Sequence, residues 1–338
     1  MIIPNYLICN VISKIGTEVW ESAGLSSHMF LLYQTSKSMK EAVLDQIHKP
    51  RNVWIEVLPS RLQHLTTIFT LTHIKIKNEE ELSIYNVYKA LLSLTNIVKL
   101  DMSGLTENNM DIDALTFCKG LGPNCPLLQE LRLSILFKDA FTYQDEAQTI
   151  AQAQSPAPCD GGECWMSQIP NLRVLDLRNM GLYSDLVSNI LVACNSCVNL
   201  VELDLSDNEI FYVHEILSAE VTLYIKTLKM NYNGLGYDGD LDDSDVEEEY
   251  RNTVENDGYY LFGIKELLER YTSLTSLSLG FNQFIEQEGI GIGNYLKTNT
   301  NIKYLDISGN FSPPCDGLNN IIEAWNGDPN RDPNNLKI

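Results

Sequence analysis

The segment 237–250, YDGDLDDSDVEEEY, places oxygen-bearing side chains at spacings that could suit a calcium ion. Asp238, Asp240, Asp242, Ser244 and Glu249 occupy positions 1, 3, 5, 7 and 12 of a twelve-residue frame. A helix-loop-helix calcium site spaces its ligands in nearly the same way, but it needs glycine at position 6, where this chain has aspartate. We therefore interpret the segment as a solvated, self-repelling loop. Weak calcium binding and docking of a basic partner are the alternatives.

Negative charge dominates the whole chain, whose 338 residues carry a formal net charge of −21. Nearly half of this excess lies between residues 238 and 257, which hold ten carboxylates and one arginine. Such a surface repels phosphate backbones and anionic lipids, so we expect neither a nucleic-acid nor a membrane partner. The first fifteen residues lack the pattern of a secretory signal, and no stretch has eighteen uninterrupted apolar residues. We expect a soluble protein of the cytoplasm or nucleus.

Other residues that could do chemistry do not form a convincing site. The pairs Cys159/Cys164 and Cys194/Cys197 could each supply half of a zinc site, but neither has an obvious second half nearby. The glycines of GIGIGN (289–294) lack the spacing of a phosphate-binding loop. The five histidines are dispersed. We predict that the protein is not an enzyme and that it needs no metal or cofactor.

A repeated pattern supplies the elements that would position any functional residue. The template LxxLxLxxNxL recurs as LVELDLSDNEI (200–210), IKTLKMNYNGL (225–235), LTSLSLGFNQF (274–284) and, shortened, IKYLDISGN (302–310). Looser copies begin at residues 71, 97, 128 and 172. The leucines of L-x-L share one face of a short strand, and the asparagine at position 9 can bind the backbone where the chain turns. From about residue 70 to residue 325, the chain resembles leucine-rich repeat proteins.

The spacing of the repeats predicts their architecture. The starts at 172, 200, 225, 274 and 302 are 28, 25, 49 and 28 residues apart, and a period near 28 leaves room for a helix on the outer side of each repeat. Segments such as SDLVSNILVACNSC and FGIKELLERYTS have apolar residues at helical spacing. The chain is thus similar to the ribonuclease-inhibitor-like class of repeats. This resemblance implies an α/β solenoid, a horseshoe with parallel strands inside and helices outside, preceded by a small helical module.

The domain organisation follows from where the repeat begins and where it is interrupted. We predict a helical module at 1–48, a leucine-rich repeat domain at 49–325 and a polar C-terminal tail at 326–338. Two steps between repeats are too long for one repeat, which predicts insertions near 138–166 and 237–258.

The N-terminal module resembles an F-box, a three-helix module often attached directly to leucine-rich repeats. The resemblance rests on a leading Ile-Pro pair, two apolar residues at helical spacing and a later Leu-Leu stretch. It implies docking onto the Skp-type adaptor of a cullin-RING ubiquitin ligase. The matching positions are Ile3, Pro4, Leu7, Val11 and Leu31. The alternative is a plain helical cap, which a solenoid needs in any case.

The residues that flank the core leucines of each strand form the candidate binding surface. In this architecture they point to the concave face. Their row is polar and of mixed charge, which suits hydrogen bonding to a protein, although a merely solvated face would have the same composition. The candidates are Lys99, Asp101, Glu130, Arg132, Asp176, Arg178, Glu202, Asp204, Lys229, Asn231, Tyr304 and Asp306.

These observations favour a substrate receptor, in which the F-box-like module recruits the ligase and the repeats select the protein to be ubiquitinated. The competing hypothesis is a scaffold that occupies a fixed place in a larger assembly and has no ligase role. The two hypotheses differ in what they expect residues 1–48 to bind.

Overall fold

The computed structural model of the chain describes residues 55–57, 72–76, 88–89, 95–105, 114–135, 137–138, 165–211, 213, 224–235 and 263–338. Its internal contacts divide the chain into unit 1 (1–140 with 165–172) and unit 2 (141–164 with 173–338). The predicted module 1–48, the insertion 237–258 and nearly all of the insertion near 138–166 lie outside the described residues.

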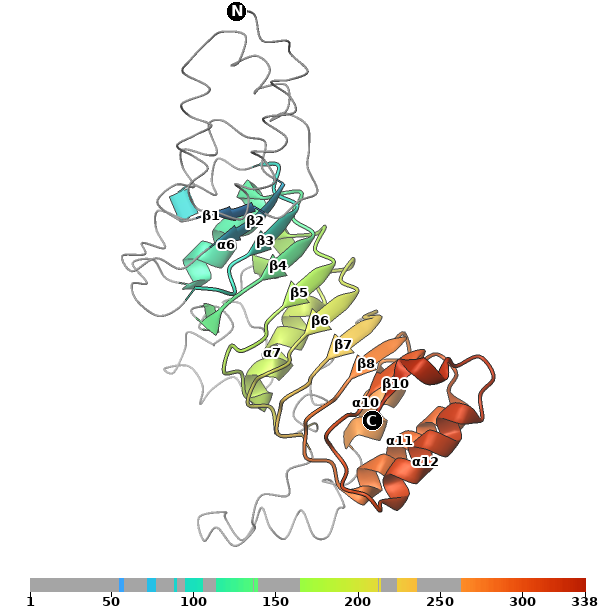
Figure 1. Cartoon of the computed structure of the whole chain (residues 1–338). Helices are drawn as coiled ribbons and strands as arrows, with labels where there is room; N and C mark the ends of the chain where they lie inside the picture. Colours follow the sequence, from blue (N-terminus) through green and yellow to red (C-terminus); the bar gives the residue numbers. More distant parts are fainter. Residues whose placement is uncertain are drawn as a thin grey trace, which may run out of the picture. The chain divides into compact units, whose positions relative to one another are not determined.

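Unit 1 contains short parallel strands that pair in sequence order, together with helix α6 and the 3-10 turn η2 (Figure 1). The central residue of each repeat keeps the same register, since Ile74 pairs with Leu100 and Leu100 with Leu131. Phe117 of the helix packs against Phe137 with ring centroids 5.0 Å apart. The elements are β1 (Ile55–Val57), β2 (His73–Ile76), β3 (Lys99–Asp101), α6 (Ala114–Asn124), β4 (Glu130–Arg132) and η2 (Trp165–Gln168).

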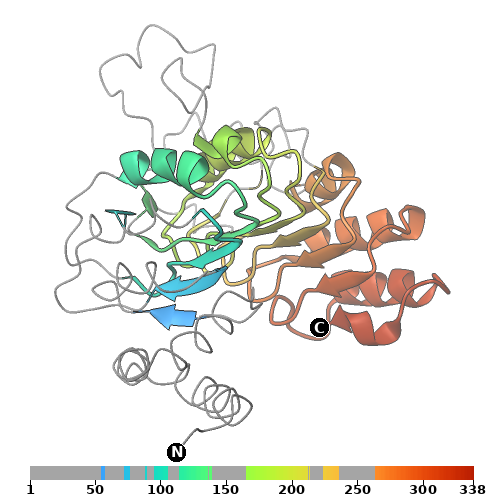
Figure 2. The same ribbon diagram turned by 90° about the horizontal axis from the view of Figure 1, so that it is seen from above.

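Unit 2 repeats the same arrangement, with parallel strands in sequence order and helices on one side of them (Figures 1 and 2). The predicted parallel strands and outer helices are therefore confirmed within this unit. Its strands are β5 (Val174–Asp176), β6 (Glu202–Asp204), β7 (Thr227–Lys229), β8 (Ser276–Ser278), β9 (Tyr304–Asp306) and β10 (Leu336–Lys337). The helices with described bounds in this unit are α7 (Ser184–Cys194), α10 (Gly263–Arg270), α11 (Glu286–Thr298) and α12 (Asp316–Asn326).

The leucines of the template form the core because alternate strand residues point to the same face. In β6 and just after it, Leu203 and Leu205 are 0 % and 1 % exposed. The central leucines pair across neighbouring strands, for example Leu203 with Leu228 and Leu277 with Leu305. Each repeat thus completes the apolar core of the next, which a single repeat could not do alone.

The position-9 asparagines bind the backbone, as the sequence predicts. The amide of Asn208 donates to the carbonyls of Leu177 and Leu205 at 3.0 and 2.9 Å, and its Oδ1 accepts from the N–H of Met180 at 2.9 Å. The equivalent residues Asn233, Asn282 and Asn310 make the same kind of bonds to the repeat before them. This ladder satisfies backbone groups that would otherwise be buried without partners.

The glycines of GIGIGN lie in α11, where Gly289 and Gly293 allow close packing against α12. A Cβ at Gly289 would lie 2.7 Å from the backbone of Gly317, and a Cβ at Gly293 would lie 2.4 Å from the side chain of Asn320. A glycine run that could be mistaken for a phosphate loop is therefore part of a helix interface.

The predicted polar tail 326–338 extends the sheet of unit 2. Its 3-10 turn η3 (Pro333–Asn335) leads into β10, which runs parallel to β9. The buried side chain of Arg331 anchors this segment by donating to the carbonyls of Leu296, Ile302 and Ala324 at 2.9, 3.3 and 3.0 Å. Across the described residues, no helix combines the length and apolar character needed to cross a membrane.

Candidate functional site

The residues at positions 3, 5 and 7 of each repeat form a row on the open side of the strands, which we call the strand face of each unit. The structure places the predicted residues at these positions. Lys99, Asp101, Glu130 and Arg132 belong to unit 1, and Asp176, Arg178, Glu202, Asp204, Lys229, Asn231, Tyr304 and Asp306 belong to unit 2. The two strand faces are considered separately.

On the strand face of unit 1, the four predicted residues form one connected set of ion pairs. Lys99 Nζ lies 2.6 Å from Glu130 Oε2, and Arg132 Nη2 lies 3.0 Å from Glu130 Oε1. Arg132 Nη1 also approaches Asp101 Oδ2 at 3.9 Å. Because Asp101 and Glu130 are buried, these cations cover the carboxylates and hold them in place.

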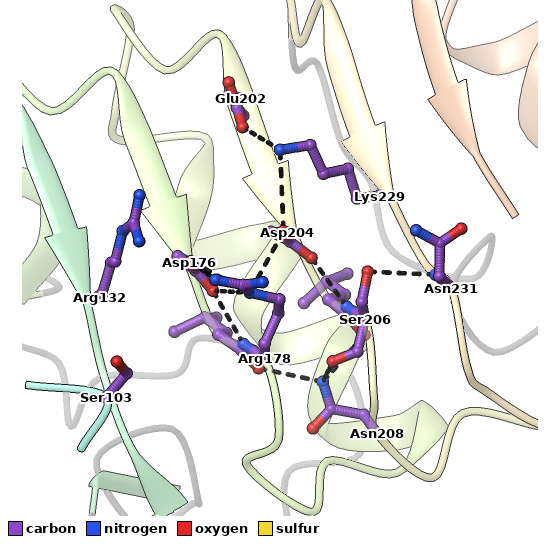
Figure 3. Close-up of polar contacts among 12 residues, drawn as sticks. Ser103, Arg132, Asp176, Arg178, Glu202, Asp204, Ser206, Asn208, Lys229 and Asn231 are labelled. Atoms are coloured by element: carbon purple, nitrogen blue, oxygen red, sulfur yellow. Dashed lines mark hydrogen bonds and ion pairs between the residues drawn. The ribbon is translucent and has the colours of Figure 1, made fainter. Parts of the chain in front are cut away.

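On the strand face of unit 2, Arg178 bridges the aspartates of two repeats (Figure 3). Its Nε and Nη2 donate to the two carboxylate oxygens of Asp176 at 3.0 and 2.9 Å, and its Nε lies 3.5 Å from Asp204 Oδ2. The side chains of Asp176 and Asp204 are 8 % and 7 % exposed, whereas that of Arg178 is 50 % exposed. The buried carboxylates therefore hold the guanidinium in place, while its solvent-facing side stays open to a partner.

Lys229 extends this network to the next strand. Its ammonium lies 2.5 Å from Glu202 Oε1 and 3.8 Å from Asp204 Oδ2, as Figure 3 shows. Burial raises the pKa of the Asp204 carboxyl, and the nearby charge of Asp176 adds to the rise. Hydrogen bonds from Ser206 and the charge of Arg178 oppose it. Asp204 is thus held by cations from two neighbouring repeats.

Position-5 aspartates have a second role, since each binds the residue two positions later. Asp204 Oδ1 accepts from the N–H of Ser206 at 3.1 Å, and Asp306 Oδ1 accepts from the N–H and hydroxyl of Ser308 at 3.0 and 2.7 Å. Asn231, at position 7 of its repeat, makes a hydrogen bond to the next repeat, since its Oδ1 accepts from the N–H of Gly280 at 2.7 Å. These contacts order the strand face before any partner binds.

Tyr304 lies at the end of the row, beside Asp306. Burial and then the charge of Asp306 raise the pKa of the Tyr304 phenol, whereas Lys229 and a hydrogen bond with Ser278 lower it. The twelve predicted residues therefore fall into local groups, with the tightest in unit 2 formed by Asp176, Arg178, Glu202, Asp204 and Lys229.

The sequence-based selection missed several residues on these surfaces. His73 pairs in register with Lys99, and burial followed by the charge of Lys99 lowers its pKa, against the charge of Glu130. Its place at position 3 of LTHIKIKN could have identified it. The exposed rings of Tyr232 and Phe281, at position 8 of their repeats, stack with centroids 4.5 Å apart. Their shared position is the signal that could have paired them.

The structure brings no metal-binding set together among the residues it describes. Cys194 and Cys197 are buried, and no group of three or more potential ligands forms in the described ranges. Cys159, Cys164 and the acidic frame 238–249 lie outside those ranges. What the described geometry supplies is an ordered array of charged groups and hydrogen-bonding groups, suited to recognising another polar surface.

The match to a family profile agrees with the repeat pattern. Residues 196–210 and 272–291 match a family profile described as a leucine-rich repeat. No curated protein matches the sequence significantly. One similar solved structure is internalin C2 of Listeria monocytogenes, with 13 % identity and a TM-score of 0.36, covering 83 % of this chain and 90 % of that one. Another is internalin F of the same organism, with 14 % identity and a TM-score of 0.35, covering 90 % and 81 %.

Proposed function

We propose that the chain, which matches a leucine-rich repeat profile at residues 196–210 and 272–291, is a non-catalytic recognition protein whose strand face in unit 2 binds another protein. The observation that carries this proposal is the network of Arg178 and Lys229 over buried carboxylates. Side chains that are already ordered lose little entropy on binding, and arginine is enriched among the residues that contribute most to the affinity of protein interfaces.

Affinity capture from cells that make the protein, followed by quantitative mass spectrometry, tests this proposal. We expect Arg178→Ala with Lys229→Ala to reduce recovery of specific partners at least about tenfold, the loss that about 1.4 kcal/mol produces. The matched control is Lys265→Ala with Lys297→Ala, which removes two cations from α10 and α11. Unchanged recovery with the strand-face variant would contradict the proposal.

A second variant separates binding from folding, because removing Arg178 leaves buried carboxylates less well paired. Ser276 lies at position 3 of β8 and is only partly buried. Ser276→Arg adds bulk to the strand face without removing an existing ion pair. It should block partner capture while the thermal unfolding midpoint stays close to that of the wild type.

For residues 1–48, we propose that the F-box-like pattern recruits a Skp-type adaptor, which would make the protein a substrate receptor of a cullin-RING ubiquitin ligase in the cytoplasm or nucleus. The support is the sequence pattern of Ile3, Pro4, Leu7, Val11 and Leu31. Co-purification with a Skp-type adaptor should be lost on Leu7→Asp plus Val11→Asp while the repeats stay folded. If these changes leave co-purification unaltered, the result would contradict this proposal and favour a scaffold without a ligase role.

A further inference from the structure

Two stacked aromatic rings lie at the margin of the unit 2 strand face, just after β7 and β8. The ring centroids of Tyr232 and Phe281 are 4.5 Å apart, with an angle of 3° between the ring planes. The Phe281 ring also lies over Gly309, where an added Cβ would be 2.7 Å from ring atom Cδ1. Tyr232 and Phe281 are nevertheless 56 % and 49 % exposed. Because the faces of the Phe281 ring are covered, the stack presents ring edges to the solvent.

Folding alone does not explain aromatic residues at these positions. Tyr232 and Phe281 occupy position 8 of their repeats, and their φ angles of 53° and 56° lie in the left-handed region. The other repeats of unit 2 have Asn179, Asp207 and Gly309 there, also with positive φ, and these residue types adopt that region at low cost. Bulky residues with positive φ are outliers that cluster at functional sites. The stack therefore keeps a strain that asparagine or glycine would relieve.

Hydrogen bonds connect the stack to Asp204, which lies at the centre of the polar network. Asp204 Oδ1 accepts from the N–H of Ser206, and Ser206 Oγ accepts from the N–H of Asn231 at 3.2 Å (Figure 3). Asn231 Oδ1 in turn accepts from the N–H of Gly280 at 2.7 Å. Asn231 and Gly280 directly precede the two aromatic residues. The rings are thus held at a fixed place relative to the polar network, so one partner can contact both.

The exposed ring edges favour one kind of side chain. The edge of an aromatic ring carries partial positive charge, which disfavours a cationic group there. The net charge of −21 disfavours the approach of an acidic segment. An aliphatic side chain meets neither obstacle, and it gains dispersion contacts and loses water when it packs against the rings.

We propose that the Tyr232–Phe281 stack is an apolar anchor for the protein partner of the strand face, which places a leucine, isoleucine, valine or methionine side chain against the ring edges. Aromatic residues are enriched in protein interfaces relative to the rest of the surface. The stack gives the otherwise polar strand face such an apolar contact. This inference rests on the proposed recognition function and specifies what the partner presents.

Photo-crosslinking from position 232 in cells that make the full chain tests the inference. A benzoylphenylalanine replaces Tyr232, so one aromatic residue takes the place of another. The control carries the same group at Tyr224, which is 78 % exposed in the same repeat but precedes β7. We expect position 232 to crosslink a protein that is also captured through Arg178 and Lys229, with mass spectrometry placing the crosslink at or beside an aliphatic residue. Position 224 should not crosslink that protein.

Variants assign the contact to the stack. Phe281→Asn removes one ring, and because asparagine accepts the left-handed backbone, the relief of strain offsets the lost ring contact. Its thermal unfolding midpoint should stay close to that of the wild type, while recovery of the crosslinked protein falls at least about tenfold. Phe281→Tyr, which keeps a ring, should retain recovery. Arg178→Ala with Lys229→Ala should reduce the crosslink from position 232, since the same partner makes both contacts.

Three results would overturn the inference: a crosslink from position 232 that does not depend on Arg178 and Lys229, a crosslink to a second copy of this chain, or normal recovery with folded Phe281→Asn. Capture through Arg178 and Lys229 without any crosslink from position 232 would also overturn it, while the recognition function would remain standing. Failure to capture any protein through Arg178 and Lys229 would instead contradict the recognition function itself.

Discussion

Glu288 in the first turn of α11 is a buried acid whose ionisation opposes folding. It is 4 % exposed, and burial raises its pKa to about 7, with a further rise from Glu266 and an opposing hydrogen bond from the N–H of Ile264. Because the folded pKa of Glu288 lies above the unfolded value of 4.5, the contribution of Glu288 to the free energy of unfolding is most favourable below pH 4.5. This contribution falls as the pH rises from there to about 7 and is constant above.

Glu288→Gln should remove this pH dependence, since glutamine still accepts from Ile264 and cannot ionise. We expect the variant to be more stable than the wild type at pH 8 by up to about 3 kcal/mol, and the difference to shrink towards pH 4.5. Denaturant unfolding at several pH values measures it. A difference that does not vary with pH would contradict this account of Glu288.

Residue-level geometry is also where the sequence was least informative. The template correctly predicted the role of Asn208 and its equivalents, because their backbone bonds are fixed by position within one repeat. It did not predict that Asp176 and Asp204 are buried beneath Arg178. That arrangement depends on contacts between side chains of different repeats, which the spacing of one repeat does not specify.

At the level of elements, the α11–α12 interface depends on small residues. The backbones of Gly289 and Gly317 approach so closely that a Cβ on Gly289 would lie 2.7 Å from the Gly317 backbone. A rigid backbone cannot move aside as a flexible side chain can. The helical spacing of this segment was predictable, whereas the close approach was not, because it depends on how the next repeat packs.

Gly289→Ala should therefore destabilise the protein by about 1–3 kcal/mol through overpacking. The matched control is Gly291→Ala in the same helix, where the added Cβ meets Lys265 at an ordinary 3.6 Å. This control should be neutral or stabilising, by up to about 1 kcal/mol, because alanine favours a helix more than glycine does. Similar effects of both changes in thermal unfolding would contradict the packing account.

For the molecule as a whole, the repeat pattern predicted the parallel strands and the helices, because the same leucine spacing and a similar length recur in successive repeats. It did not predict that residues 326–338 form η3 and β10, since the anchoring contacts of Arg331 reach residues up to 35 positions away. It also selected the strand-face residues by position without showing which of them pair.

The proposed recognition function requires a protein partner on the strand face of unit 2. Site-specific photo-crosslinking from a benzoylphenylalanine at Tyr304, on β9, measured against one at Glu269, on α10, reports on such a partner without adding much bulk, because position 304 is already aromatic. We expect discrete crosslinked partners from position 304 that unlabelled wild-type protein competes away, and none from position 269. Equal crosslinking from both positions, or crosslinks from position 269 alone, would contradict it.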